Sequence, residues 1–321
     1  MPFNILQRKP KNQNFFVLEI GLERVTCAIF NKEDSQLKLA GVGRKKFSSH
    51  EDIFNSSIEA LDALSAIVPD IPEKGILGIS GGSLETITTI ARYERPKATK
   101  PIDHKETEQV LNQVIENLDK TNKKIFFSTI SGAKIDGVSV TNPLGLRGQK
   151  VELSCFVAFQ SEVEVELLNR LVGEIEIDVK KMLPTSFSVC KILEQKEVKN
   201  ALLFRVGLAK SEITILEEGH VSDIYPFDLG MNNLSYIQFA WEAALKDIEK
   251  EHAPSLIWLL ADNDEAELEK LKEELKSYDW QSKINIPINP KVEIVSSVHH
   301  FSVSDITLYA LAQEGTTNED S

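Results

Sequence analysis

The sequence predicts an α/β protein with two domains, and three observations support this fold class. The chain has 321 residues, enough for about two domains of ~150 residues each. Its composition, 42% hydrophobic and 26% charged, is that of a globular protein with sizeable cores. Short β-branched segments, typical of strands, alternate with segments whose apolar residues recur at helical spacing. Such alternation is typical of α/β architectures.

Residues 1–14 are predicted to be a basic, flexible tip ahead of the first strand. Its apolar and basic side chains are Phe3, Ile5, Leu6, Arg8, Lys9 and Lys11. A short basic and apolar segment of this kind can touch an anionic membrane weakly. The alternative is an ordinary frayed terminus. At most, therefore, a weak peripheral membrane contact is expected here.

Residues 15–96 are predicted to form the first part of domain one. Strands are expected at 15–21, 24–30, 37–43, 76–80 and 86–90. Ser48 or Ser49 is expected to cap a helix that Pro69 ends. The last two strands flank a turn at Gly81-Gly82.

Residues 97–180 are predicted to form a compact subdomain, reached through a linker at 96–101. Asp103 with Glu106 three residues later makes a capping box for one helix, and Ser161 with Glu164 makes a second. Strands are expected between the two helices, at 124–130, 138–141 and 149–159.

The rest of the chain is predicted to continue the alternation. The expected elements are a helix at 185–199, strands at 201–206 and 212–216, a helix at 235–251, a strand at 255–261, a helix capped by Asp262 and Glu265, a strand at 291–297 and a helix at 304–312. Gly315 is expected to stop the last helix, leaving 315–321 as a disordered tail.

Charge and cysteine usage exclude several classes of function. The net charge of −13, from 49 acidic and 36 basic residues, repels phosphate backbones, so no nucleic-acid partner is expected. The three cysteines have neither metal-site spacing nor an even count, which indicates buried thiols in a reducing compartment. No apolar run approaches the ~18–20 residues that span a bilayer. The start of the chain lacks a secretory signal, so a cytoplasmic protein is expected.

A turn-rich run in the 97–180 subdomain resembles a motif of the FtsA branch of the actin/Hsp70 ATPase superfamily. The run is IDGVSVTNPLGLRGQKVEL at 135–153, in which asparagine-proline and spaced glycines fix a turn between two strands. An ordinary hairpin would need the same turn chemistry. The resemblance implies a protein-contact surface formed by Asp136, Asn142, Pro143, Gly145, Arg147 and Gly148.

Other segments match the same family in the same chain order. FVLEIGLERVTCAI at 16–29 resembles the first phosphate hairpin, ISG at 79–81 precedes the insert, and KMLPTSFSV at 181–189 resembles the helix that returns to domain one. Residues 201–207 and 213–219 resemble the second phosphate hairpin, and 228–230 resemble the family segment next to it in the chain.

This resemblance implies an actin-like (ribonuclease H-like) two-domain fold. Its parts would be domain 1A at 15–96 and 181–200, an inserted SHS2-type α+β subdomain 1C at 97–180, and domain 2A at 201–314. Only about 35 residues separate Asp228 from the turn that follows the strand ending at Ala261. A 2B subdomain is therefore expected to be reduced or absent.

Family members hold Mg-ATP between the two phosphate hairpins, where the resemblance places Glu19, Gly21, Arg205, Gly207 and Lys210. Magnesium needs oxygen ligands, whereas an arginine offers only donors and a permanent charge. Leu208 and Ala209 resist the positive φ of a phosphate loop. A pseudo-ATPase with no catalytic residue, no metal and no bound cofactor is therefore expected. The alternative is a metal-free site in which Arg205 and Lys210 bind phosphates directly.

The resemblance then implies an FtsA-like cell-division or envelope scaffold that acts through protein contacts and self-association. FtsA, however, docks its tubulin-like partner mainly on 2B and ends in an amphipathic membrane helix, whereas this chain ends TTNEDS. PilM proteins of type IV pilus assembly belong to the same clan, and the basic tip is similar to theirs. A PilM-like adaptor that binds a peptide of a membrane pilus protein near the insert, at the inner face of the cell membrane, is one alternative. A working actin-like ATPase is the other.

Overall fold

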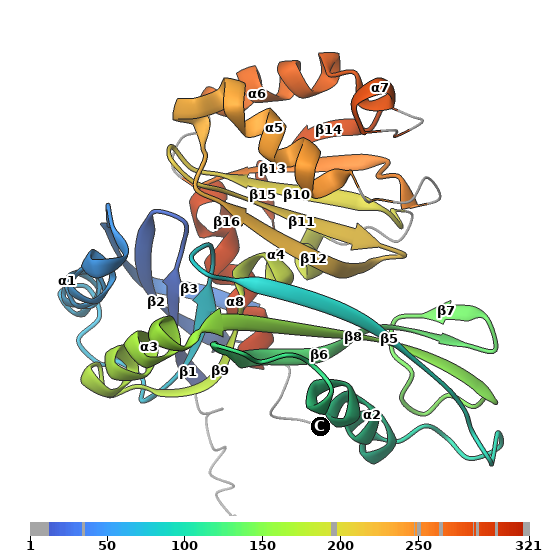
Figure 1. Ribbon diagram of the computed structural model, residues 1–321. Helices are drawn as coiled ribbons and strands as arrows, with labels where there is room; N and C mark the ends of the chain where they lie inside the picture. Colours follow the sequence, from blue (N-terminus) through green and yellow to red (C-terminus); the bar gives the residue numbers. More distant parts are fainter. Residues whose placement is uncertain are drawn as a thin grey trace, which may run out of the picture.

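The computed structural model describes residues 13–33, 36–193, 198–246, 248, 252–262, 266–284, 286, 289–298 and 301–316. It has two lobes, each built on a five-stranded sheet, and a subdomain with a third sheet that projects to one side (Figure 1). The expected basic tip at 1–14, apart from residues 13 and 14, lies outside the described residues. Within the described part, no helix is long and apolar enough to cross a membrane.

The first lobe is a sheet with the strand order β3-β2-β1-β4-β9. Its strands are β1 Gln13–Ile20, β2 Arg24–Glu33, β3 Gln36–Lys46, β4 Lys74–Ile79 and β9 Asp178–Pro184. The first three are antiparallel, and β4 and β9 run parallel to β1. Val17 packs toward one face and Phe16 and Leu18 toward the other, so β1 is buried on both sides.

One outer face of this sheet is covered by α1 (Ile53–Ser65), which the short helix η1 (His50–Asp52) precedes. The helix lies directly on β3, because a Cβ at Gly43 would be only 2.0 Å from the carbonyl oxygen of Ala60. Glycine is therefore required at this position by the close approach of the two backbones.

The second lobe repeats the strand order of the first, as β12-β11-β10-β13-β14. Its strands are β10 Ala201–Val206, β11 Ser211–Glu217, β12 His220–Phe227, β13 Leu256–Ala261 and β14 Lys291–Ile294. As in the first lobe, three antiparallel strands are followed by two parallel ones. The duplicated order confirms an α/β fold with two lobes.

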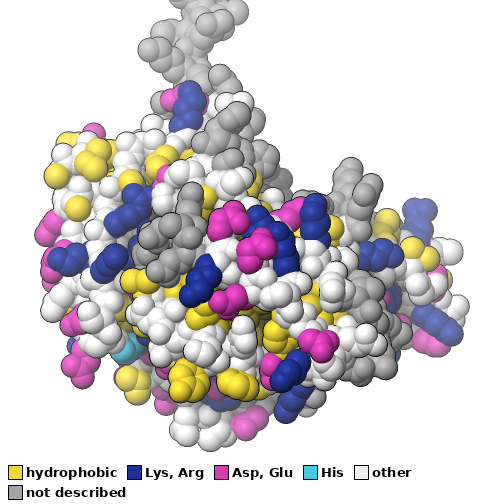
Figure 2. Space-filling view, turned by 90° about the horizontal axis from the view of Figure 1, so that it is seen from above, with side chains coloured by type: hydrophobic (Ala, Val, Ile, Leu, Met, Phe, Trp, Pro, Cys, Tyr) yellow, Lys and Arg dark blue, Asp and Glu magenta, His cyan; other side chains and the backbone are white. Residues whose placement is uncertain are grey.

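Three helices cover the outer face of the second sheet (Figure 1). They are α5 Leu234–Leu245, which follows the short helix η2 (Met231–Asn233), α6 Ala266–Ser277 and α7 Trp280–Ile284. On α6, Lys272 pairs with Glu269 and Lys276 with Glu273, as expected for a solvated face. Seen from above, basic and acidic side chains lie interspersed on the molecule (Figure 2).

Two helices, α4 (Thr185–Leu193) and α8 (Ile306–Thr316), lie between the two sheets (Figure 1). The short strands β15 (Ser297–Val298) and β16 (Phe301–Ser302) and the turn η4 (Val303–Asp305) lead into α8. One hydrophobic cluster runs from Val17 in the first sheet through Phe187 and Leu311 in these helices to Leu203 in the second. The lobes therefore share a continuous core.

The third sheet belongs to the subdomain, here called the insert, and has the order β5-β8-β6-β7. Its elements are β5 Glu85–Glu94, α2 His104–Glu116, β6 Lys123–Ile135, β7 Val138–Val140, β8 Lys150–Ser161 and α3 Glu162–Glu174. Both expected N-caps are confirmed: Asp103 accepts the N–H of Glu106 at 2.9 Å, and Ser161 accepts that of Glu164 at 3.3 Å.

The strand expected at 86–90 is present, but it joins the insert rather than the first lobe. β5 pairs along its whole length with β8 and with no strand of the first sheet. The division between lobe and insert therefore lies near Gly82, not at residue 96. Strand periodicity says which faces are buried, but it does not say which sheet a strand joins.

The segment 96–101 was expected to be a linker, but a buried arginine fixes its path. Arg95 is 6% exposed. Its guanidinium donates to the carbonyl oxygens of Lys100, Pro101 and Gly148 at 2.7, 3.2 and 3.2 Å, and to the carboxylate of Glu106 at 2.7 and 3.0 Å. The prolines there shape a turn that the insert holds in place.

Several expected boundaries in the second half of the chain are wrong. The return to the first lobe is strand β9 followed by α4, not a helix from 181. The helix was expected to reach 199, but residues 198 and 199 are not helical, and 194–197 are not described. The helix expected to reach 251 ends at Leu245. The last helix, α8, continues through Gly315 instead of stopping there. A Cβ at Gly315 would be 2.7 Å from the side chain of Ile76, so the glycine allows α8 to pack closely on the first lobe. The helix α8 also packs on β1, β4 and α4. Residues 317–321 of the expected tail are not described.

Candidate functional site

The two lobes meet at a buried arginine. Arg205, in β10, is 1% exposed. Its Nη2 donates to Oε1 of Glu19 at 3.1 Å and to Oδ1 of Asp262 at 3.0 Å, and its Nη1 donates to Oγ of Ser80 at 2.5 Å. Glu19 and Ser80 belong to the first lobe, whereas Asp262 follows β13 in the second. Asp262 was expected to cap the helix that follows with Glu265, but residues 263–265 lie outside the described part of the chain.

Glu212 of β11 adds a third carboxylate to this cluster. Its Oε2 accepts the N–H of Gly81 at 3.0 Å and its Oε1 accepts the hydroxyl of Ser186. Burial raises the pKa of Glu212, while the charge of Arg205 and these hydrogen bonds oppose the shift. Burial by itself would lower the pKa of Arg205, but the charges around it, that of Asp262 first, raise it instead. We call these four side chains, Glu19, Arg205, Glu212 and Asp262, the ion cluster.

The first lobe contributes a tight turn after β1. The N–H of Gly21 donates to the carbonyl oxygen of Arg24 at 2.9 Å, and a Cβ at Gly21 would lie 3.0 Å from that oxygen. Oε2 of Glu19 accepts the hydroxyl of Thr307 in α8 at 2.7 Å. Both carboxylate oxygens of Glu19 are therefore engaged by groups of the protein.

The second lobe contributes the loop after β10, and a carboxylate from the first lobe binds it. Oε2 of Glu23 accepts the N–H of Leu208 at 2.7 Å and its Oε1 accepts the N–H of Ala209 at 2.6 Å. Gly207 supports this loop by donating its N–H to the carbonyl oxygen of Lys210 at 2.8 Å. The two loops that sequence reasoning placed around a nucleotide thus contact each other directly.

Little space remains between these loops. Nζ of Lys210 lies 5.9 Å from the centre of the Phe47 ring and 3.9 Å from Oδ1 of Asp228. The cavity beside them, lined in part by Gly21, Gly81 and Lys210, has a volume of about 30 Å³. Small-molecule sites begin at ~300 Å³, so the described cavity is about ten times smaller.

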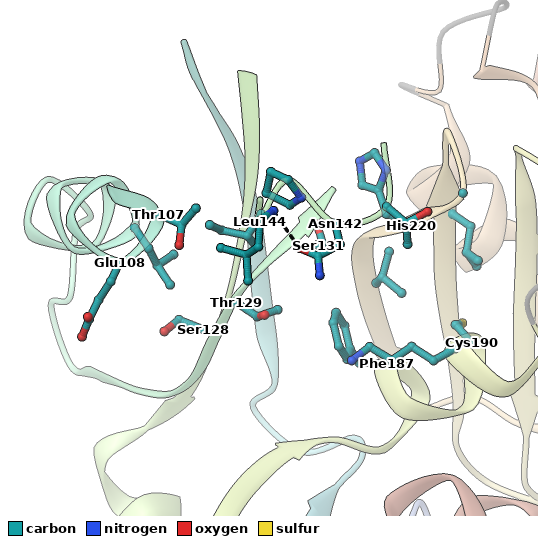
Figure 3. A pocket seen from close by; sticks show the side chains of 18 of the residues that line it. Thr107, Glu108, Ser128, Thr129, Ser131, Asn142, Leu144, Phe187, Cys190 and His220 are labelled. Carbon is teal, nitrogen blue, oxygen red and sulfur yellow. Dashed lines mark hydrogen bonds between the residues drawn. The ribbon is translucent and has the colours of Figure 1, made fainter. Parts of the chain in front are cut away.

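A much larger cavity, of about 690 Å³, lies between the insert and the second lobe (Figure 3). We call it the groove. One wall is α2, with Thr107 and Glu108, and the opposite wall is formed by α4 and the turn between β11 and β12, with Phe187 and His220. Between the two walls lie consecutive residues of β6, 128–131.

The edge of β6 that faces the groove has no partner strand over most of its length. β8 pairs with β6 on one side. On the other side β7 pairs only with residues 133–135, and the described part of the chain supplies no further strand. An unpaired strand edge presents backbone N–H and C=O groups that can pair with another extended chain.

Contacts between the insert and the second lobe fix the far wall of the groove. The ring of His220 packs on β6, where a Cβ at Gly132 would be 2.6 Å from its Nδ1. Lys134 pairs with Glu218 at 2.7 Å. Burial lowers the pKa of His220, which keeps the imidazole neutral at neutral pH.

Two of the six insert residues singled out from the sequence line the groove. They are Asn142 and Pro143, in the turn after β7. Oδ1 of Asn142 accepts the N–H of Leu144 at 3.0 Å, a side-chain turn that aims this segment into the groove (Figure 3).

The other four lie at the far end of the insert and shape its loops. Oδ1 of Asp136 accepts the N–H of Lys150 at 2.8 Å. Gly145 has φ +78°, and a Cβ at Gly148 would be 2.2 Å from the side chain of Ile135. Arg147 is exposed. Glycine is thus required for turn geometry at two of these positions.

The turn after β1 and the loop after β10, both singled out from the sequence, do contact each other. The side chains that fill the space between them were not expected. Glu23 carries no pattern that would distinguish it from any acidic residue in a turn. His220 and Phe187 of the groove are far from β6 in sequence. Only the tertiary approach of the lobes and the insert places them.

Comparisons with known proteins support the fold. No protein-family model matches the chain, and no curated protein matches its sequence. A solved structure titled "PilM-PilN type IV pilus biogenesis complex" superimposes with a TM-score of 0.64 at 11% identity, over 95% of this chain and 99% of that one. A Bacteroides thetaiotaomicron protein with an actin-like ATPase fold and unknown function superimposes with a TM-score of 0.50 at 11% identity, over 94% and 96%. The chain therefore has a two-lobed, actin-like ATPase fold.

Proposed function

We propose that this protein is an actin-like scaffold that binds a segment of a partner protein in the groove and does not use ATP. The observation that carries the proposal is the ion cluster, which occupies the junction where an actin-like fold would place a nucleotide. Both Glu19 and Asp262 are paired with Arg205, whose positive charge opposes the binding of a magnesium ion at this place. The buried guanidinium would also have to be displaced before a triphosphate could enter.

The groove supplies the binding surface in this proposal. Its 690 Å³ suits several residues of an extended chain. The free edge of β6 offers backbone hydrogen bonds, and the apolar floor around Ile130, Leu144 and Phe187 offers side-chain pockets. Glu108 gives one wall of the groove a negative charge, whereas Lys191 on the other wall is paired with Glu314 at 2.6 Å. This favours a segment whose basic end lies against α2.

The fold match favours a pilus-assembly adaptor over other scaffolds. The PilM of the matching structure is in a complex with PilN, so that protein holds a partner. We place this chain likewise among proteins that act at the inner face of a membrane, through a cytoplasmic segment of a membrane partner.

An FtsA-like division scaffold is the second candidate, favoured by the turn motif of the insert. Asp136 and Gly148 make the compact loop that the 135–153 run implies. The helices α2 and α3 on an antiparallel sheet are consistent with an SHS2-type insert. Among the described residues between β12 and β13, α5 is the one α-helix, which supports a reduced 2B subdomain.

Calorimetry with Mg-ATP at millimolar concentration tests the first half of the proposal, and no heat of binding is expected. Saturable binding that Arg205→Met abolishes would overturn it and favour the metal-free alternative.

Photocrosslinking in host cells tests the second half. A photoreactive residue at Thr129, in the groove, should capture a membrane-pilus or division protein, whereas the same residue at Lys272 on α6 should not. Equal capture from both positions, or none from Thr129, would remove the groove as the binding site.

A further inference from the structure

Helix α5 is apolar on its outer side as well as on its inner side. Ile237, Trp241 and Leu245 lie on the inner side and are buried in the core of the second lobe. Tyr236 and Phe239 lie on the outer side, and each is 64% exposed. A helix that is apolar all round is normally covered on every side. The composition of α5 therefore suits an outer face that another surface covers.

The helix α6 shows what a solvated outer face looks like in the same lobe. Both helices cover the outer face of the second sheet (Figure 1). The sequence of α6, AELEKLKEELKS, contains seven charged residues, whereas that of α5, LSYIQFAWEAAL, contains only Glu242. The carboxylate of Glu242 accepts the hydroxyl of Tyr278 at 2.6 Å. Position in the fold therefore does not explain why α5 lacks charges, and exposed apolar surface of this kind marks an interaction site.

The outer face of α5 is complementary to itself when one copy of the helix is reversed. Tyr236, Phe239, Ala240 and Ala243 are three, one and three positions apart, so they share one side of the helix. If two copies pack antiparallel with the twofold axis between positions 239 and 240, Tyr236 lies opposite Ala243 of the partner subunit. In the same arrangement Phe239 lies opposite Ala240 of the partner subunit. Large side chains opposite small ones allow two helices to interlock closely.

The charges at the two ends of α5 favour the same antiparallel arrangement. Asp228 comes just before the helix, and its side chain is 92% exposed although Lys210 lies 3.9 Å away. Lys246 follows the last turn and is exposed. Reversing one copy brings each Lys246 to the end of the other helix that Asp228 precedes. A parallel pair would instead place like charges together, so charge complementarity selects the antiparallel one.

We propose that the outer face of α5 docks a second copy of this chain, with the two α5 helices antiparallel across a twofold axis. The contact uses the same face on both copies, so association closes at two and builds no filament. The 12 residues of α5 span ~18 Å, which is short for a standard interface, so the dissociation constant should be about 10 μM. No residue of α5 lines the groove, so the inference stands whether or not a partner segment binds there.

Sedimentation velocity of the full chain, from about 1 to about 200 μM, tests the pairing. The wild type should pass from monomer to dimer and form no larger species. Phe239→Lys and, separately, Tyr236→Lys should weaken association at least about tenfold, because each places a cation in the apolar contact. Ser277→Lys adds the same charge at an exposed position of α6 and should leave association unchanged. Both α5 positions are largely exposed, so the thermal unfolding of the variants should match that of the control.

A wild type that is still monomeric at about 200 μM would refute the pair and leave the α5 face to a different protein. Lysine variants that associate as well as the wild type would also refute it.

Cysteine cross-linking tests the orientation of the two helices. The three native cysteines are buried and should not react. With copper phenanthroline as oxidant, Ala243→Cys mixed with Tyr236→Cys should form a disulfide between copies. Ala243→Cys alone should not, because the two 243 positions would be ~10 Å apart along the helix axis. Efficient cross-linking of Ala243→Cys with itself would indicate parallel helices and rule out the proposed arrangement.

Discussion

Nη2 of Arg205 in the second lobe lies 3.1 Å from Oε1 of Glu19 in the first, although the two residues are 186 positions apart. Each is at most 2% exposed. This contact joins the two lobes, and it carries a charge into the interior that neighbouring carboxylates must balance.

Removing the cation of this pair should be costly. Arg205→Met would leave Glu19 and Asp262 buried without their partner, and it should reduce the free energy of unfolding by about 3–5 kcal/mol. Adding Glu19→Gln and Asp262→Asn should recover part of the loss. Urea unfolding measures both, with Arg92→Met, which breaks an exposed pair with Glu152, as the control. An Arg205→Met protein as stable as that control would contradict the ion cluster's role.

Arg95 should hold the insert in the same way. Arg95→Met removes hydrogen bonds to three carbonyl oxygens and the paired contact with Glu106, and it should lower stability by about 3 kcal/mol. Hydrogen exchange should quicken first in 96–118 and 142–148. If exchange instead rises evenly over both lobes, the arginine does not act locally.

Two glycine-to-alanine changes should have opposite effects. Gly43→Ala places a methyl group 2.0 Å from the carbonyl oxygen of Ala60 and should destabilise by about 2–3 kcal/mol, because β3 and α1 must separate. Gly173→Ala in α3 meets nothing within 4 Å and should stabilise by up to about 1 kcal/mol. Thermal unfolding of the two variants side by side checks the sign of each effect.

Asp223 should make stability depend on pH. Burial, and then the charge of Glu217, raises the pKa of Asp223 from 3.8 to about 7. Between these values the folded state keeps a proton that the unfolded chain releases, so this residue's contribution falls as pH rises from about 4 to 7 and is level above.

Asp223→Asn removes that dependence. Because the site is partly open to solvent, the variant should gain only about 1 kcal/mol over the wild type at pH 8 and nothing at pH 4. Urea unfolding at the two pH values measures the difference. A gain that is larger at pH 4 than at pH 8 would show that the sign is wrong.

The sequence was sufficient for most strands of the two lobes, because each of these is a short apolar run between turn residues. Buried positions such as Phe16 and Leu203 show this pattern clearly. It was not sufficient for β9 and β12, whose polar and charged residues hide the strand pattern.

The N-caps at Asp103 and Ser161 were equally readable, since the signal lies within four residues. The reciprocal half of each capping box is not formed, because Glu106 binds Arg95 and Glu164 accepts the N–H of Ser83. Features whose signal lies within a few neighbouring residues could therefore be predicted from the sequence.

Contacts between residues far apart in the sequence could not be predicted from the local residue pattern. That β5 pairs with β8 depends on which edge is free once the first sheet has formed. That Glu23 binds the loop at Leu208 depends on how closely the lobes approach. The resemblance grouped Arg205 with Glu19, but nothing near Arg205 in the chain indicated that Asp262 and Glu212 complete the ion cluster. That the protein binds no nucleotide stays a prediction.

The two walls of the groove belong to different parts of the fold. The elements α2 and β6 belong to the insert, and the turn that carries His220 belongs to the second lobe. Any rotation of that lobe about α4 and α8 must therefore widen or narrow the space between them. By thermodynamic reciprocity, a polypeptide bound in the groove shifts the preferred angle between the lobes to the same extent that this angle changes the affinity for the polypeptide. In the proposed function, binding of the partner segment would therefore be coupled to the orientation of the second lobe.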